Sequence, residues 1–258
     1  FEIYNEEHVR AYISLFLGAF SVFFIGVYDD KNNISATKKS FILVGLLYLI
    51  INFDKTLVPK EIYFEYFDYV VYLENFTIPF TVLSIFFLMN SLNLYDGTNL
   101  QSGFFLSFVF IVFIYRGIFS EFFFILLTSN LFFIYKNYSG KLFFGDAGIF
   151  LNSYIISYFI LKSYNNGLLS TDLIMIIFFL PSIDLIRLFI MRLIFLKNPF
   201  IGDRNHFHHI LTLLFNDNLL KVNLALMLIC SLPIILYDFL NISFILSFIP
   251  SLLFYFSL

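Results

Sequence analysis

The chain has 258 residues, of which 60% are hydrophobic and only 13% are charged, with a mean hydropathy of +0.88. A soluble domain of this length carries charge on about a quarter of its residues. The composition therefore excludes a water-soluble domain and indicates an integral membrane protein. The net charge of -3 is too small to suggest nucleic-acid binding, and a single cysteine, Cys230, excludes an intramolecular disulfide.

Apolar runs recur along the whole sequence at lengths that suit helices crossing a membrane, which need about 20 residues. We expect spans over residues 12–28, 41–53, 76–92, 100–115, 122–135, 149–161, 173–196, 219–237 and 242–258. The predicted fold class is all-α, a polytopic transmembrane helical bundle with about nine spans. One integral membrane domain is expected over residues 1–258.

Alternation of these spans assigns the loops to two sides of the membrane. One side holds the loops 29–39, 93–99, 136–146 and 197–209 together with Lys221. Ten of the fifteen Lys and Arg fall on this side if Arg187 and Arg192, near the end of a span, are counted there. The excess of basic residues makes this side cytoplasmic. On the other side, loop 54–75 alternates aromatic and acidic residues and suits the outer membrane interface.

Four polar motifs interrupt the apolar chain, and all four are predicted on the cytoplasmic side. They are Asp29-Asp30 and the segments 93–97, 143–148 and 203–209. Carboxylates at the end of a membrane helix are costly near lipid, so they usually mark a site or a cation partner. Hard oxygen ligands with cationic donors facing them describe a Mg²⁺ or Mn²⁺ site for phosphoryl transfer.

The first two motifs each have a plainer alternative. The adjacent carboxylates of Asp29 and Asp30 repel each other, which raises one pKa or recruits a divalent cation; the alternative is a solvated helix end. Asn93 and Asp96 lie three residues apart and can face one cation or polar ligand. The alternative there is an ordinary turn at Asp96-Gly97.

The last two motifs have stronger functional signals. Gly145 and Gly148 flank Asp146 and let a ligand approach the backbone closely, although Asp146 as a simple helix cap is the alternative. Three histidines within four positions of segment 203–209 indicate a phosphate-binding or acid–base cluster, whereas a single histidine would more often be a structural hydrogen-bonder. Their spacing does not match a structural zinc site.

One helix outside the motifs also carries charge. Asp184 and Arg187 lie three apart on one helix face, so we interpret them as a local ion pair without a catalytic role. Pro181 is expected to bend this span.

The order and spacing of the motifs resemble the polyprenyl-phosphate N-acetylhexosamine-1-phosphate transferases, a branch of glycosyltransferase family 4. Asp29-Asp30, continued by Ile34-Ser35 and Lys39, resembles the aspartate pair of that family. Three further segments resemble its later motifs: Asn-Ser-Leu-Asn-Leu-Tyr-Asp-Gly at 90–97, Phe-Phe-Gly-Asp-Ala-Gly at 143–148 and Asp-Arg-Asn-His-Phe-His-His at 203–209. The resemblance runs from about residue 17 to residue 211.

The resemblance implies transfer of an N-acetylhexosamine-1-phosphate from a UDP-sugar to a polyprenyl (undecaprenyl) phosphate, with UMP released. It implies Mg²⁺ as cofactor, with Mn²⁺ as the alternative ion, and an active site on the cytoplasmic face of the bacterial inner membrane. Such a reaction initiates the synthesis of cell-envelope polysaccharides, lipopolysaccharide among them. The expected partners are the UDP-N-acetyl sugar, the polyprenyl phosphate, the lipid bilayer and a second copy in a homodimer, with no nucleic acid.

The resemblance also assigns roles to single residues. Catalytic roles fall to Asp29, Asp30, His206, His208 and His209. Substrate contacts fall to Lys39, Asn93, Asp96, Asn99, Phe143 and Arg204, and Phe143 is expected to stack on uracil. Metal coordination falls to Asp146, with Asn93 as a weaker ligand.

The sequence departs from the family pattern in three places. The family's upstream cytoplasmic loop, with its Lys-Pro/Thr-Pro and Gly-Gly signature, has no counterpart, so we expect the chain to lack the family's N-terminal spans. Asn99 stands where many relatives have Asp, and Ile149 where they usually have Ser. The alternative function is a secondary transporter, whose ionisable residues would lie near the bilayer midplane in internally symmetric repeats.

Overall fold

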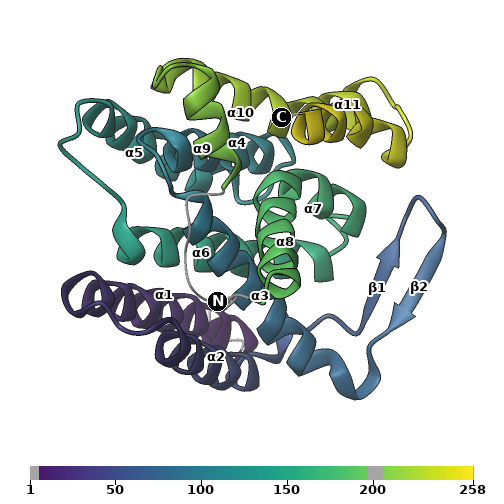
Figure 1. Ribbon diagram of the computed structural model, residues 1–258. Helices are drawn as coiled ribbons and strands as arrows, with labels where there is room; N and C mark the ends of the chain where they lie inside the picture. The colour runs from purple at the N-terminus through teal and green to yellow at the C-terminus, as the bar shows by residue number, and fades with distance from the viewer. Residues whose placement is uncertain (1–5, 197–205, 258) are drawn as a thin grey trace. The chain divides into compact units, whose positions relative to one another are not determined.

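The computed structural model describes residues 6–196 and 206–257, with side chains from residue 9 onward. These residues fold into helices and one short hairpin (Figure 1). The chain forms two compact units, each built from two stretches: residues 1–93 with 144–171, and residues 94–143 with 172–258. The single domain expected over the whole chain stays a prediction.

Unit 1 contains three complete helices and most of a fourth. They are α1 (Glu6–Asn32), α2 (Ala36–Phe53), α6 (Gly145–Asn165) and α3 (Thr77–Tyr95). Between α2 and α3 lie two single-turn 3₁₀ helices and two strands: η1 (Lys55–Leu57), β1 (Glu61–Phe64), β2 (Tyr69–Tyr72) and η2 (Glu74–Phe76). Helix α1 packs along α6 and also contacts α2 (Figure 1).

Small residues let α1 approach α6 closely. A Cβ on Gly18 would lie 2.1 Å from the Tyr154 hydroxyl, and a Cβ on Gly26 would lie 2.3 Å from the Cα of Ala147. The same Tyr154 hydroxyl donates a 2.8 Å hydrogen bond to the carbonyl of Ser14. Small residues and interhelical hydrogen bonds are the usual means of packing helices in lipid. This contact places the end of α1 beside the first turn of α6.

Loop 54–75 contains a short hairpin, a local exception within a fold that is otherwise helical, as predicted. Strands β1 and β2 pair antiparallel, with Glu61 opposite Tyr72 and Phe64 opposite Tyr69. Aromatic and β-branched residues, which favour strands, make up most of both paired segments, Glu-Ile-Tyr-Phe at 61–64 and Tyr-Val-Val-Tyr at 69–72. Tyr164 on α6 holds the hairpin, since its hydroxyl accepts from Tyr63 N–H at 2.9 Å and donates to the Glu61 carbonyl at 3.1 Å.

Unit 2 contains the remaining elements. They are α4 (Gln101–Tyr115), α5 (Ser120–Tyr138), almost all of α7 (Thr171–Ile177), α8 (Phe179–Ile194), α9 (Phe207–Leu214), α10 (Leu219–Ile234), the π-helical turn η3 (Ile235–Phe239) and α11 (Phe244–Ser257). Helix α4 packs against α5 and α10, and α10 also contacts α8, α9 and α11. The buried amide of Asn130 on α5 crosslinks the first pair by donating to the Gly103 carbonyl at 2.7 Å and to the Ser107 hydroxyl at 2.9 Å.

The predicted bend before the histidine motif is confirmed. Helices α7 and α8 meet at 74° across Phe178. Pro181 follows three residues later and has no N–H, and its ring excludes the carbonyl of the residue four positions earlier, Ile177. Helix α7 accordingly ends at Ile177.

The predicted count of nine spans is not confirmed within the described residues, although each predicted segment contains a helix. Four stretches are long and apolar enough to cross a membrane: Val9–Asn32, Ala36–Phe53, Glu74–Tyr95 and Leu219–Phe239. The bent pair α7–α8 makes a fifth if it counts as one span. Helices α4 and α11 have 15 and 14 residues, and at about 1.5 Å per residue they are shorter than the ~30 Å hydrocarbon core.

Candidate functional site

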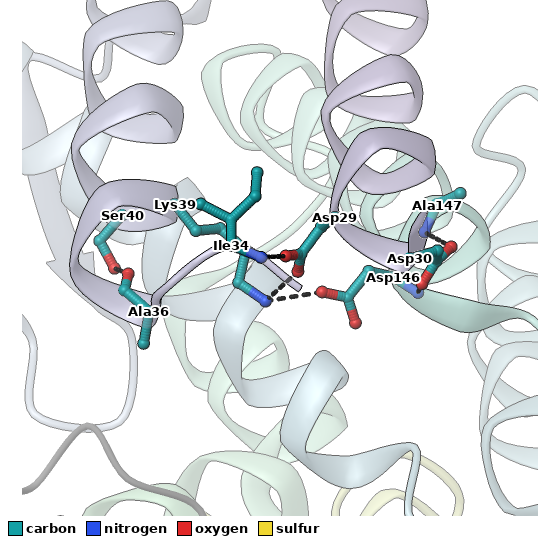
Figure 2. Close-up of polar contacts among 8 residues, drawn as sticks. All are labelled: Asp29, Asp30, Ile34, Ala36, Lys39, Ser40, Asp146 and Ala147. Atoms are coloured by element: carbon teal, nitrogen blue, oxygen red, sulfur yellow. Dashed lines mark hydrogen bonds and ion pairs between the residues drawn. The ribbon is translucent and has the colours of Figure 1, made fainter. Parts of the chain in front are cut away.

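The side chain of Asp29 closes the connection between α1 and α2. Asp29 lies in the last turn of α1 and is only 6% exposed. Its Oδ1 accepts a 2.7 Å hydrogen bond from the Ile34 amide, and its Oδ2 accepts a 2.6 Å bond from Lys39 Nζ (Figure 2). The alternative of a solvated helix end is therefore wrong for this residue.

Lys39 joins two carboxylates that are far apart in the sequence. Its Nζ lies 2.6 Å from Asp29 Oδ2 and 2.6 Å from Asp146 Oδ2 (Figure 2). The ammonium also lies 5.5 Å from the centre of the Phe150 ring. The three charged side chains are between 8% and 23% exposed. The two carboxylates thus converge on one cation position, which the lysine ammonium occupies.

Asp30 faces the opposite way from Asp29 and caps helix α6. Its Oδ1 accepts from the Asp146 amide at 2.9 Å and its Oδ2 from the Ala147 amide at 3.2 Å (Figure 2). A carboxylate is stabilised there because the first amides of a helix have no partner within it and carry partial positive charge. Asp146 is therefore not the cap of its own helix, and its side chain can face Lys39 instead.

Gly145 is required where Asp30 meets α6. Its φ of +60° lies in the left-handed region, which residues with a Cβ adopt at a cost. A Cβ there would also lie 2.7 Å from Asp30 Oδ2. The glycine therefore allows the cap to form.

The electrostatic environment of Asp146 is unusual for a carboxyl group. Burial raises its pKa, the hydrogen bond with Asp29 raises it further, and Lys39 lowers it in part, which brings the pKa to about 6. Its charge near neutral pH therefore depends on the cation beside it.

In unit 2, buried amide side chains hold the loop that joins α3 to α4. Leu100 has a φ of +74°, and its amide donates to Oδ1 of Asn137 on α5 at 2.5 Å. The Asn99 carbonyl accepts a 3.0 Å hydrogen bond from Nδ2 of Asn223 on α10. A left-handed leucine is a strained conformation that persists because its surroundings fix it.

Gly97 in this loop lies directly against the histidine motif. A Cβ on Gly97 would lie 1.9 Å from Nε2 of His208. His208 is 2% exposed, and its Nε2 has no hydrogen-bond partner among the described residues. Burial, with the nearby His209 and His206, lowers the pKa of His208 to about 3, so it is neutral at physiological pH. Two predicted motifs therefore meet within unit 2.

Asp96 precedes this contact and is half-buried. Burial raises its pKa above the ordinary value, and the Ser102 hydroxyl lowers it in part. Phe143, the predicted stacking residue, is 64% exposed, so its ring face is open to a ligand.

The histidines form a stacked cluster at the start of α9. The rings of His206 and His208 lie 5.4 Å apart at an interplanar angle of 9°, and those of His208 and His209 lie 4.2 Å apart. Nδ1 of His206 is 2.9 Å from Oδ2 of Asp184 on α8. Asp184 is therefore more than the partner of a local ion pair with Arg187, although that ion pair is present at 2.8 Å.

Two comparisons with known proteins bear on this geometry. The family model described as glycosyl transferase family 4 matches residues 12–164, more than half of the chain. The chain belongs to glycosyl transferase family 4. A probable undecaprenyl-phosphate N-acetylglucosaminyl 1-phosphate transferase of Bacillus subtilis (strain 168) is 29% identical over 221 residues. That alignment covers 80% of this chain, and the chain spans 59% of the length of that relative.

Within this member of glycosyl transferase family 4, several of the predicted residues gather in two clusters. Asp29, Lys39 and Asp146 form one polar cluster, with Asp30 beside it on the α6 terminus. Gly97 and the histidines meet in unit 2. Arg204 lies outside the described residues, and Asn93, half-buried near the end of α3, keeps its predicted metal and substrate roles as predictions.

Sequence reasoning missed the residues that position these groups. Asn137 and Asn223 are buried amides in apolar helices, and that placement alone was a usable signal. Tyr255, whose hydroxyl donates to Asp184 at 2.8 Å, gave none, because a tyrosine in an apolar run is an ordinary membrane residue.

Proposed function

We propose that this glycosyl transferase family 4 chain transfers an N-acetylhexosamine-1-phosphate from a UDP-sugar to a polyprenyl phosphate. A phosphate oxygen of the lipid attacks the β-phosphorus of the UDP-sugar. The bond from that phosphorus to the bridging oxygen breaks, UMP leaves, and a lipid-diphospho-sugar remains. The observation that carries this proposal is the convergence of Asp29 and Asp146 on one cation position, in a chain similar to a transferase of this kind.

The donor set of this cluster fits a Mg²⁺ ion. Asp29 and Asp146 offer hard carboxylate oxygens to a position that already holds a positive charge, the Lys39 ammonium. Mg²⁺ commonly binds through one or two carboxylates and completes its shell with water and substrate phosphates. Bound Mg²⁺ would neutralise charge on the diphosphate.

The chain's own residues take the remaining roles. Lys39, once it leaves the two carboxylates, supplies a positive charge for a phosphate oxygen. Asp30 keeps the first turn of α6 in place through two amide hydrogen bonds, so it positions Asp146. Phe143 presents an exposed ring on which uracil can stack.

The membrane setting follows from the apolar helices and the distribution of charge. Helices such as Val9–Asn32 and Leu219–Phe239 suit a lipid bilayer, and the predicted cytoplasmic side carries most Lys and Arg. We therefore place the reaction at the cytoplasmic face of the bacterial inner membrane, where it would begin a cell-envelope polysaccharide. Family membership favours this activity over the secondary transporter.

The decisive experiment measures UMP release by the purified protein in detergent micelles or liposomes. The reaction contains UDP-N-acetylglucosamine, undecaprenyl phosphate and Mg²⁺, with parallel reactions that omit the lipid, replace Mg²⁺ by EDTA or use other UDP-sugars. We expect UMP and a lipid-linked sugar in equal amounts, dependent on both lipid and metal. UDP-sugar flux into liposomes without UMP release would overturn the proposal and support the transporter.

A further inference from the structure

The carboxylate of Asp184 is a buried hub of hydrogen bonds in unit 2. The residue is 6% exposed, and its Oδ1 accepts from the Arg187 guanidinium at 2.8 Å, the Tyr255 hydroxyl at 2.8 Å and the Phe207 amide at 3.2 Å. Its Oδ2 lies 2.9 Å from Nδ1 of His206. An ionised carboxylate only accepts hydrogen bonds, so the ring hydrogen of His206 belongs on Nδ1.

Three helices fix the position of this carboxylate. Arg187 lies one turn further along α8, and its Nε also donates to the Tyr255 hydroxyl at 2.6 Å. Tyr255 belongs to α11 and packs its ring 4.5 Å from that of Phe207 on α9. Phe207 is also the first residue of α9, so Asp184 holds the start of the helix that follows His206. The ring and the backbone beside it are thus held by one group.

The other nitrogen of the ring is left for a different partner. Among the described residues, no hydrogen bond engages Nε2 of His206, and the ring is further oriented by its stacking on His208. We infer that Asp184 is a positioning residue that keeps His206 in the Nδ1–H form and presents Nε2 to a phosphate oxygen of the substrates. The part of this inference that concerns the substrate phosphate rests on the proposed function.

The chemistry of the ring follows from this arrangement. In the Nδ1–H form, Nε2 carries a lone pair and can take the proton of a singly protonated lipid phosphate. The imidazolium that forms then donates its Nε2–H to a phosphate oxygen, and it passes this proton to the phosphate of UMP as UMP leaves. Throughout these steps Nδ1 keeps its hydrogen and donates it in a hydrogen bond to Asp184, as in other carboxylate–histidine pairs.

The first test reads the tautomer directly and needs no substrate. The chain has four histidines, so ¹⁵N-histidine labelling in detergent micelles gives few signals, and the signal lost in His206→Gln identifies this ring. We expect neutral His206 to carry its hydrogen on Nδ1 in the unsubstituted protein. In Asp184→Asn the amide can donate to Nδ1, so we expect the hydrogen to move to Nε2. A wild-type ring protonated on Nε2, or an unchanged tautomer in the variant, would overturn the inference.

The second test asks whether the tautomer matters for turnover. Asp184→Asn is expected to lower kcat about 100-fold or more with little change in KM for the UDP-sugar, and Asp184→Glu to recover part of the loss. The matched control is Asp238→Asn, since Asp238 pairs with Arg116 in the same unit without a histidine partner. A loss in Asp184→Asn no larger than in this control would show that Asp184 has only a structural role.

The two tests separate this inference from the proposed function. If the unsubstituted protein releases no UMP, the proposed function fails, while the nuclear magnetic resonance signals of His206 still decide the role of Asp184. If UMP is released but the tautomer does not respond to Asp184→Asn, the inference alone fails.

Discussion

The Lys39 ammonium lies 2.6 Å from the carboxylate of Asp146, although 107 positions separate the two residues in the chain. The same ammonium lies 2.6 Å from Asp29, so one positive charge offsets two largely buried carboxylates. Lys39 thus stabilises unit 1 and at the same time fills the position proposed for a divalent cation. These two roles can be tested separately.

Replacing Lys39 by methionine should destabilise the protein and increase its response to Mg²⁺. The variant leaves two neighbouring carboxylates without their cation, which we expect to lower the free energy of unfolding by about 1–3 kcal/mol in the absence of divalent ions. Added Mg²⁺ should raise the stability of this variant more than that of the unsubstituted protein, because no ammonium competes for the position. Chemical unfolding in detergent, with and without Mg²⁺, measures both effects.

The matched control is Lys38→Met, in the same turn of α2. Lys38 is exposed, so its replacement should leave both the stability and the response to Mg²⁺ close to those of the unsubstituted protein. Equal unfolding curves for the two lysine variants would show that Lys39 does not neutralise the carboxylates in solution.

Replacing Asp146 by asparagine should abolish UMP release at intact expression. The substitution removes a charged oxygen from the proposed Mg²⁺ site, and losing several kcal/mol of stabilisation lowers the rate about a thousandfold or more. Asp68→Asn is the control, because Asp68 is an exposed carboxylate in the hairpin. Turnover retained by Asp146→Asn, at an unfolding midpoint matching the control, would rule out Asp146 as a metal ligand.

Local sequence signals predicted the helices well, but not how many of them cross the membrane. Apolar runs place each helix because a chain in lipid must satisfy its own backbone, and the bend before Pro181 follows from its missing N–H. Composition places a helix, but crossing the membrane also requires sufficient length. Helix α4 covers Gln101–Tyr115, one residue less than the predicted span 100–115. At about 1.5 Å per residue its 15 residues are too short for the ~30 Å hydrocarbon core.

In the candidate site, too, the sequence predicts which residues take part but not which residues they contact. The sequence predicts Asp29 and Asp146 as site residues because carboxylates in an apolar chain are costly. It does not predict that both face Lys39, which the motif pattern associates with substrate alone. Asp30 is the clearest example of a contact that the local sequence cannot predict, since the first amide that it caps comes 116 residues later. Asp184 was underestimated for the same reason: three of its partners lie on other helices or beyond its own turn.

Replacing Gly145 by alanine should destabilise unit 1 through the Asp30 cap. The added Cβ meets both a φ of +60° and the Asp30 carboxylate, so we expect the free energy of unfolding to fall by about 1–3 kcal/mol. Gly45→Ala on α2 is the control, because nothing lies within 4 Å of its added Cβ. It should be neutral or stabilising by up to about 1 kcal/mol. Equal effects of the two substitutions would contradict the cap geometry.

Replacing His208 by glutamine should weaken the dependence of stability on acid. The folded-state pKa of His208 is lowered to about 3 from its ordinary 6.5, so between these values the unfolded chain binds a proton that the folded chain does not. Stability contributed by the neutral ring is therefore complete above pH 6.5 and falls as the pH drops toward 3. Between pH 7 and pH 5 this loss amounts to about 2 kcal/mol. Other groups, Asp146 among them, titrate in both proteins and cancel in the difference. Chemical unfolding at both pH values should show the extra loss only in the unsubstituted protein, whereas parallel pH profiles would mean that His208 is accessible to protons when folded.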